Sequence, residues 1–299
     1  MSADVERRTV VVTGASGYLG RSVRMTFRRH GWRVRALNRS AVPDPWSETV
    51  HFRLDEPVSS EALRGASALV HCAWDFSLTT WSRVLAVNVQ GSDALFRAAA
   101  TAGVARLVFV STMSAFEGCK SLYGRAKLEV ERIALGRGAL VLRPGLIYGD
   151  DAGGMFGRLV GTIRKSTLVP MFGDGSQVFH LIHQDDLSEF IRAYCEGLVS
   201  PVDRAISAAH EHGWAFRRIL EEVARAQGKT LRFLPIPWRP VWLVLRLCEA
   251  LRLPLRFRSD SLMSLMNQNG TPSFELGQQV GFKCRPFKAA TLKLAPSSD

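Results

Sequence analysis

Short hydrophobic runs alternate with segments in which apolar residues recur every three to four positions over the first half of the chain. The runs are typical of buried strands, and they lie at residues 10–13, 34–37, 68–72, 107–111 and 139–142. The segments between them predict helices, at residues 20–30, within 81–104 and at 123–135. Because strands and helices take turns along the chain, we expect an α/β fold with a doubly wound parallel sheet.

This alternation ends near Gly149 and gives way to glycine-rich turns, a short apolar segment near residues 179–183 and a basic tail. One stretch of the tail, residues 235–257, is strongly apolar but is interrupted by five charged residues. A membrane-spanning helix needs about 18 or more consecutive apolar residues, so we interpret the stretch as an amphipathic helix packed on the protein itself. Peripheral contact with a membrane surface stays open as the alternative.

Composition limits the kind of protein further. The five cysteines are scattered without paired spacing, which favours reduced thiols in the cytoplasm over a disulfide framework or a metal site. The charged N-terminus has no apolar core, so no secretory signal is expected. The net charge is +12, and residues 211–299 hold 14 Lys and Arg against 7 Asp and Glu. This excess favours an anionic small molecule over nucleic acid, for which no binding motif is present, although an ordinary basic composition explains it equally well.

The segment TVVVTGASGYLG, residues 9–20, joins a predicted strand to a predicted helix through three glycines. In dinucleotide-binding proteins the first glycine allows a tight turn, the second lets the backbone approach a pyrophosphate, and the third lets helix and strand pack closely. The positive end of the helix then faces the phosphates. We therefore expect cofactor contacts from Gly14, Ser16, Gly17, Tyr18, Leu19 and Gly20.

The end of the second strand indicates which dinucleotide is bound. An acidic residue here would accept hydrogen bonds from the adenosine ribose of NAD, but the chain has Asn38, Arg39 and Ser40. A guanidinium can pair with the 2′-phosphate of NADP. We expect NADP(H) to be preferred, with NAD(H) left open as the alternative.

The chemistry is indicated by YGRAK, which places Tyr123 and Lys127 on one helix face. A tyrosine with a pKa of about 10 is a poor base at neutral pH, but a lysine ammonium and an oxidised nicotinamide would stabilise its phenolate. Ser111 and Thr112 follow a predicted strand, at the sheet edge where ligands of such folds bind. Either hydroxyl could hydrogen-bond a substrate carbonyl or alkoxide.

Together these motifs resemble the extended short-chain dehydrogenase/reductase family, also called the NAD-dependent epimerase/dehydratase family, and the resemblance covers most of the chain. It rests on seven motifs in this order: TGASGYLG (13–20), LVHCAW (69–74), NVQGS (88–92), LVFVST (107–112), YGRAK (123–127), LRPGLIYG (142–149) and IHQDDL (182–187). The resemblance implies a Rossmann-type domain at residues 1–150 with a return segment at about 178–209. Residues 151–177 and 210–299 are then expected to form a smaller, interleaved C-terminal lobe that binds the substrate.

The resemblance also implies roles for particular residues. Thr112 matches the catalytic hydroxyl, Tyr123 the acid/base and Lys127 the lysine, while Asn88 supports the site. The residues expected to line the cofactor beyond the glycine loop are His71, Cys72, Ala73, Pro144 and, near the adenine, Asp55.

Two departures from the family pattern bear on the substrate. Only eleven positions separate Thr112 from Tyr123, so the loop over the site is short. Phe179 stands where members that act on nucleotide sugars often carry an arginine that holds the diphosphate, and Arg256 or Arg258 would have to take over that part.

Three functions remain open from the sequence. The leading one is hydride transfer, with NAD(P)(H), to or from a carbonyl or hydroxyl carbon of a nucleotide-linked sugar by an oxidoreductase or epimerase. The first alternative is a reductase of a hydrophobic ketone, which Phe179, Trp238 and Trp242 would suit. The second is a non-enzymatic NADP(H)-sensing regulator, which the intact set of Tyr, Lys and hydroxyl disfavours. A homodimer also stays open.

Overall fold

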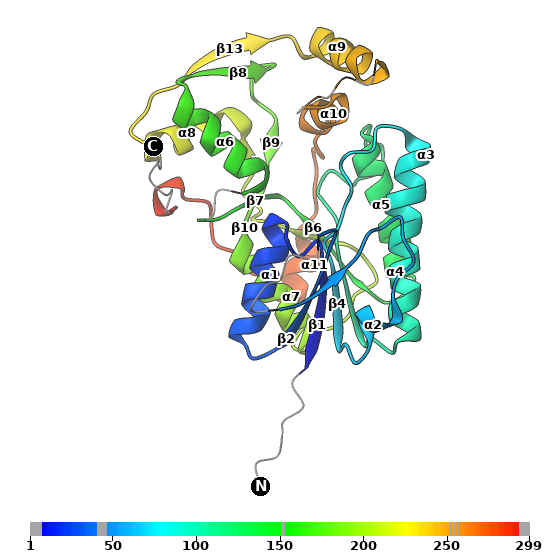
Figure 1. Ribbon diagram of the computed structural model, residues 1–299. Helices are drawn as coiled ribbons and strands as arrows, with labels where there is room; N and C mark the ends of the chain where they lie inside the picture. Colours follow the sequence, from blue (N-terminus) through cyan, green and yellow to red (C-terminus); the bar gives the residue numbers. More distant parts are fainter. Residues whose placement is uncertain are drawn as a thin grey trace.

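A computed structural model describes residues 8–40, 47–150, 153–251, 253, 255 and 257–292. Arg256, one of the expected cations, lies outside these described residues. The molecule consists of a sheet with helices on both faces and a smaller lobe above one end of the sheet (Figure 1).

The central sheet has seven strands in the order β11-β6-β5-β4-β1-β2-β3. Every neighbouring pair runs parallel, which confirms the predicted doubly wound α/β fold. The strands are β1 (Thr9–Thr13), β2 (Arg33–Asn38), β3 (Glu48–His51), β4 (Ala68–His71), β5 (Arg106–Val110), β6 (Leu140–Pro144) and β11 (Ile206–Ala208). The sequence predicted five of them and missed β3 and β11, because neither contains a continuous run of apolar residues.

Helices cover the sheet on both faces because alternate strand residues point to opposite sides. Val10 and Val12 of β1 belong to one buried cluster, whereas Val11 belongs to the other. The first face is covered by α1 (Tyr18–Arg29), α7 (Gln184–Cys195) and α11 (Glu275–Gln279). The second is covered by α2 (Ser60–Leu63), α3 (Trp81–Val84), the π-helical turn η1 (Leu85–Val89), α4 (Gln90–Thr101) and α5 (Leu122–Leu135).

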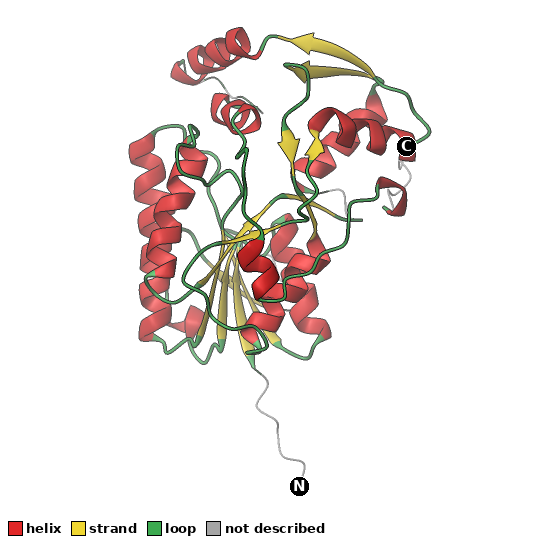
Figure 2. Ribbon diagram, turned by 180° about the vertical axis from the view of Figure 1, so that it is seen from behind, coloured by secondary structure: helices red, strands yellow, loops and turns green. Residues whose placement is uncertain are grey.

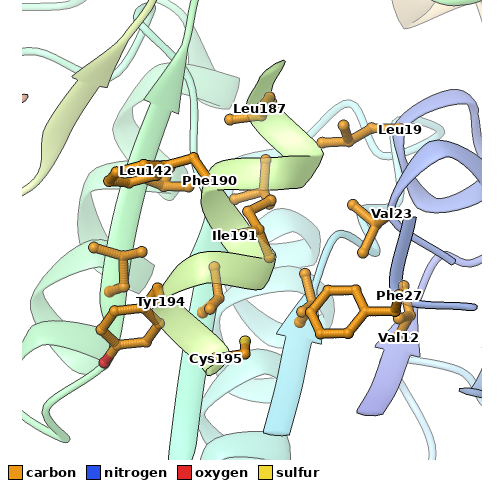
Figure 3. Packing of buried hydrophobic residues seen from close by; sticks show 14 of the residues in the cluster. Val12, Leu19, Val23, Phe27, Leu142, Leu187, Phe190, Ile191, Tyr194 and Cys195 are labelled. Atoms are coloured by element: carbon orange, nitrogen blue, oxygen red, sulfur yellow. The ribbon is translucent and has the colours of Figure 1, made fainter. Parts of the chain in front are cut away.

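Helix α7 returns to the sheet from a distant part of the sequence. Its Leu187 and Ile191 are completely buried, in the same hydrophobic cluster as Leu19, Val23 and Phe27 of α1 (Figure 3). The two helices also join through the hydroxyls of Ser22 and Ser188, 2.9 Å apart. The first core is therefore closed by residues that follow much of the smaller lobe in sequence.

Among its described residues the smaller lobe contains three two-stranded pairs: β7 (Leu146–Tyr148) with β10 (Leu181–His183), β8 (Leu168–Phe172) with β13 (Arg232–Ile236), and β9 (Val178–Phe179) with β12 (Trp214–Ala215). Its helices are α6 (Gly154–Lys165), α8 (Phe216–Ala226), α9 (Trp238–Ala250), α10 (Ser259–Met266) and the 3₁₀ turn η2 (Ala289–Thr291). Figure 2 shows the same lobe from behind. Within the described residues, no helix is long and apolar enough to cross a membrane.

Candidate active site

The turn between β1 and α1 has no room for side chains at two of its glycines. Gly14 has a φ of +63°, and a Cβ there would lie 2.9 Å from the backbone of Ala73. A Cβ at Gly20 would lie 2.2 Å from the carbonyl oxygen of Gly14. The first glycine thus allows β1 to turn against the loop after β4, and the third allows α1 to pack on the turn.

The start of α1 is suited to an anion. Its N-cap, Gly17, forms no side-chain cap, and its first turn contains no acidic residue. The partial positive charge at the start of this 12-residue helix is therefore not offset by a neighbouring carboxylate. The narrow turn and this helix end together fit the pyrophosphate of a dinucleotide.

Asn38 supports the glycine turn from the end of β2. Its side chain is 9% exposed, and Oδ1 accepts a hydrogen bond from the backbone N–H of Ser16 at 2.8 Å. Arg39 and Ser40 follow on the exposed surface. No ion pair of Arg39 is found within the described part of the chain.

A buried chain of hydrogen bonds runs from β1 to α4. The Thr13 hydroxyl oxygen accepts from the N–H groups of Cys72 and Ala73 and lies 2.7 Å from Nδ1 of His71. Nε2 of His71 lies 2.9 Å from the Ser92 hydroxyl. Burial lowers the His71 pKa to about 3, so the ring is neutral, with Nδ1 accepting from Thr13 and Nε2–H donating to Ser92.

The Ser92 hydroxyl in turn donates to the backbone carbonyl of Asn88. Asn88 lies in the π-helical turn and is completely buried. Its Oδ1 accepts from the N–H of Asp75 at 2.8 Å, and its Nδ2 donates to the carbonyl of Asp75 at 3.0 Å. The oxygen and the nitrogen of the Asn88 amide thus both bind the loop that follows β4. This loop carries aromatic residues to the site.

Tyr123 is fixed at the start of α5 by a residue that sequence reasoning missed. The carboxylate of Asp260, at the start of α10, accepts from the N–H groups of Leu122 and Tyr123 at 2.6 and 3.1 Å. Burial raises the Asp260 pKa, although these hydrogen bonds lower it. No motif marked Asp260, because it lies more than 130 residues further along the chain.

The Tyr123 ring lies among aromatic side chains. Its centroid is 5.7 Å from that of Trp74 and 5.5 Å from that of Phe76. Thr112 is a hydrogen-bond partner of the Tyr123 hydroxyl and lowers its pKa, but burial outweighs this and raises the pKa to about 12. The protein's own groups therefore keep the phenol protonated.

Lys127 lies one turn after Tyr123, and its ammonium is closer to the Trp74 ring than to the Tyr123 ring. Its Nζ donates to the carbonyl of Val110 at 2.7 Å and is 4.2 Å from the Trp74 ring centroid, against 5.9 Å from that of Tyr123. Burial lowers the Lys127 pKa to about 7. The sequence interpretation expected this lysine, together with an oxidised nicotinamide, to lower the Tyr123 pKa. Among the protein's own groups the net shift of the Tyr123 pKa is upward, because the desolvation of the ring is the larger effect.

Ser111 is joined to a buried ion pair. Its hydroxyl donates to Oε1 of Glu131 at 2.5 Å, and Glu131 also accepts hydrogen bonds from Nε and Nη2 of Arg143. Ser111 and Glu131 are each 3% exposed, so this hydroxyl points into the protein. Thr112, which is partly exposed, is the hydroxyl that the structure brings to Tyr123.

The remaining expected cofactor residues fall into two groups. Cys72, Ala73 and Pro144 lie at or just beyond the carboxyl ends of β4 and β6, near the glycine turn and Thr112. Asp55 lies in the loop after β3, where hydrogen bonds from Arg53 lower its pKa. That loop is in close contact with the start of α4, because a Cβ at Gly91 would lie 2.1 Å from the Leu54 carbonyl oxygen.

Phe179 and Arg258, the two described residues that bear on a diphosphate site, lie in different surroundings. Phe179 is 8% exposed and packs in the core of the smaller lobe, with its ring 5.4 Å from that of Phe216. Arg258 donates from Nη1 to the carbonyl of Ser77 at 2.6 Å, which places a guanidinium beside the aromatic loop. Among the described residues, no cluster of three or more His, Cys, Asp or Glu side chains is arranged to hold a metal ion.

The sheet order, the glycine turn and the Tyr123–Lys127 pair define an α/β enzyme that uses a nicotinamide dinucleotide. The chain belongs to the NAD dependent epimerase/dehydratase family, whose model matches residues 10–205. This confirms the resemblance inferred from the motifs. The chain is accordingly an NAD-dependent oxidoreductase or epimerase of the short-chain dehydrogenase/reductase type.

Several proteins are similar over much of their length. A ceramide reductase of Caulobacter vibrioides is 30% identical over 243 residues, which cover 77% of this chain and 74% of that protein. A 3 beta-hydroxysteroid dehydrogenase/Delta 5-->4-isomerase of Mycobacterium tuberculosis is 28% identical over 222 residues, covering 61% of this chain and 60% of that one. The structure of MoeE5 in complex with UDP-glucuronic acid and NAD has 22% identity and a TM-score of 0.72, and covers 95% of this chain and 97% of that one.

Proposed function

We propose that the protein is an NADP(H)-preferring oxidoreductase that acts on a carbonyl or hydroxyl carbon of a hydrophobic, lipid-like substrate. The observation that carries this proposal is the aromatic surrounding of Tyr123, whose ring lies within 6 Å of Trp74 and Phe76. Apolar surfaces of this kind bind apolar substrates through the area they remove from water.

The chain's own residues supply proton transfer and orientation in this proposal. Tyr123, protonated because of its raised pKa, donates its proton to the oxygen of a ketone as that oxygen gains charge. Thr112 orients the same oxygen through its hydroxyl. Lys127 binds the cofactor, and Ser111, Glu131 and Asn88 act as positioning residues. The nicotinamide cofactor supplies or accepts the hydride.

The names of two relatives support a lipid-like substrate. One is a ceramide reductase and the other a 3 beta-hydroxysteroid dehydrogenase. The position of Phe179 agrees with this, since a buried core residue stands where a diphosphate-binding arginine would be expected.

A nucleotide-linked sugar is the second candidate substrate, as the sequence interpretation preferred. Arg258 favours it, because its guanidinium lies next to the loop that carries Phe76 and Ser77, and a guanidinium can pair with a diphosphate. MoeE5, which binds UDP-glucuronic acid, has the same fold.

Turnover of a substrate panel tests the proposal. The purified protein is mixed with NADPH and, in turn, a long-chain ketone in mixed micelles, a 3-ketosteroid and a UDP-4-ketosugar, and NADPH oxidation is followed by absorbance. We expect turnover with a lipid-like ketone and its loss in Tyr123→Phe, by about 10²- to 10⁴-fold. Turnover of the nucleotide sugar alone would establish the second candidate in its place. Absence of any turnover together with tight NADPH binding would favour the regulator.

The preference for NADP(H) rests on Arg39. Removing one charge-assisted hydrogen-bonding partner of a phosphate weakens binding by about 1.5–3 kcal/mol, which is roughly ten- to a hundredfold. We expect Arg39→Ala to lose this much affinity for NADPH, with little change for NADH, as measured by calorimetric titration of both. Equal losses for the two cofactors would contradict a contact with the 2′-phosphate.

A further inference from the structure

Helix α9 has an apolar face that points away from the protein. None of its residues is fully buried, and the half-buried ones, such as Val241, Trp242 and Leu245, lie on the inner face. On the outer face the exposed fractions are 64% for Leu243, 58% for Val244, 61% for Leu247 and, directly after the helix, 63% for Leu251. Their spacing places all four within one stripe of about 100° around the helix axis.

The neighbouring β8–β13 ribbon continues this surface. Leu168 and Leu234 are each about half exposed, and the register pairs Leu168 with Arg232 and Leu234 with Pro170 on the outward side. Both views place α9 and the ribbon along the edge of the smaller lobe that lies farthest from the N-terminus (Figures 1 and 2). We give the name apolar rim to six large exposed apolar side chains of these elements and of the residue directly after α9: Leu168, Leu234, Leu243, Val244, Leu247 and Leu251.

The charges around the apolar rim are positive on the exposed side. Arg239 and Arg246 lie along one side of the stripe on α9, and Arg232 lies on the ribbon; all three are exposed. The sole acidic residue of α9, Glu249, faces inward, where its carboxylate accepts from the N–H and the hydroxyl of Ser259 at 2.8 and 2.7 Å. Strands β8 and β13 contain no acidic residue.

We propose that the apolar rim docks on a lipid bilayer that contains anionic headgroups. A helix that lies in the plane of the interface places its apolar stripe at the boundary of the acyl chains, while cations beside the stripe approach the headgroup phosphates. Arg239 and Arg246 occupy such positions along one side of the stripe. A second copy of the rim would instead bring the same cations face to face, and their repulsion disfavours a dimer through this surface.

Docking at this rim has a consequence for the active site. Glu249 of α9 binds Ser259, and the adjacent Asp260 holds the backbone of Tyr123, so the rim is connected to the catalytic tyrosine through the start of α10. On the proposed function, a lipid-like substrate would then enter at the side of the protein that faces the bilayer. The docking itself does not depend on that substrate, because it uses surface residues outside the catalytic set.

Vesicle flotation tests the proposal without cofactor or substrate, so its outcome is separable from that of the turnover assay. The wild-type protein is mixed with vesicles of phosphatidylcholine alone or with added phosphatidylglycerol. The test variant is Leu243→Glu/Leu247→Glu, and the matched control is Leu198→Glu, whose side chain is 72% exposed in the loop after α7. Unchanged thermal unfolding verifies that each variant is folded.

We expect wild type and Leu198→Glu to float with the anionic vesicles, and the double variant to bind them at least about tenfold more weakly. Arg239→Glu/Arg246→Glu and added salt should both weaken binding. No flotation of the wild type, or equal flotation of the double variant, would overturn the proposal. So would a wild-type oligomer that the double variant converts to a monomer, since the rim would then join two copies of the chain.

Discussion

The ammonium of Lys127 is buried, and burial disfavours its positive charge. Burial lowers the Lys127 pKa from 10.5 to about 7, so the unfolded chain binds this proton more tightly than the folded protein. The stability of the protein without cofactor therefore rises with pH between about 7 and 10.5, and the cost of charging the buried lysine is fully present below that window.

We expect Lys127→Met to have a larger free energy of unfolding than wild type at pH 7, by about 1–3 kcal/mol, even though it loses turnover. The gain is smaller than the pKa shift alone implies, because the carbonyl of Val110 loses a donor. Urea denaturation at pH 7 and 10 measures it, and Lys120→Met, at an exposed position, is the control. A variant less stable than wild type at both pH values would contradict the burial argument.

A second prediction at the residue scale concerns His71, which affects the stability of the protein at acid pH. Its pKa is lowered from 6.5 to about 3, so the folded state keeps the ring neutral while the unfolded chain protonates it. This contribution to stability is complete above pH 6.5 and is lost as the pH falls toward 3, at up to about 1.4 kcal/mol per pH unit. Urea denaturation of His71→Gln between pH 4 and 7 should show a shallower pH dependence than wild type. An unchanged slope would mean that other groups control acid unfolding.

At the scale of helices and strands, the site depends on contacts between segments that lie far apart in the sequence. Helix α5 carries the catalytic pair, yet the carboxylate that accepts its first N–H groups belongs to α10. A carboxylate at a helix start stabilises the helix through hydrogen bonds and through its dipole.

Asp260→Asn replaces part of this acceptor with an N–H₂ donor. We expect a lower melting temperature, equivalent to about 0.5–2 kcal/mol, and a lower kcat because Tyr123 is held less firmly. Calorimetry and the NADPH assay measure the two effects, with Asp203→Asn on the exposed surface as control. If kcat is unchanged although stability falls, Asp260 does not position the tyrosine.

The difference between what the sequence predicted and what it missed has a physical cause. The glycine turn, Tyr123 and Lys127 are local patterns, because each function requires residues a few positions apart on one turn or helix face. Asp260 and Glu131 act across elements, and an isolated Asp or Glu carries no local mark of its partner. The Tyr123 pKa could not be predicted either, because its direction depends on how deeply Trp74 and Phe76 bury the phenol.

For the whole molecule, the domain division at residues 1–150 and 178–209 stays a prediction, but the core suggests how to test it. Helix α7 supplies Leu187 and Ile191 to the core over α1, and β11 pairs with β6 at the sheet edge. We expect a fragment of residues 1–150 to unfold without a cooperative transition in urea, since its α1 face stays exposed to water, whereas the full chain unfolds cooperatively. Cooperative unfolding of the fragment would contradict the assignment of the return segment to this domain.

From the π-helical turn at Leu85–Val89 we expect the helix before the active site not to tolerate a change in length. A π turn holds one residue more than an α turn, so the two halves of this helix differ in phase by about 100° from a regular continuation. This offset lets Trp81 meet Arg125 of α5 while Leu95 and Phe96 pack on the sheet. A deletion of one residue here would make the helix more regular. It would also rotate Asn88 away from Asp75, so that the loop after β4 would no longer be held in place beside the active site.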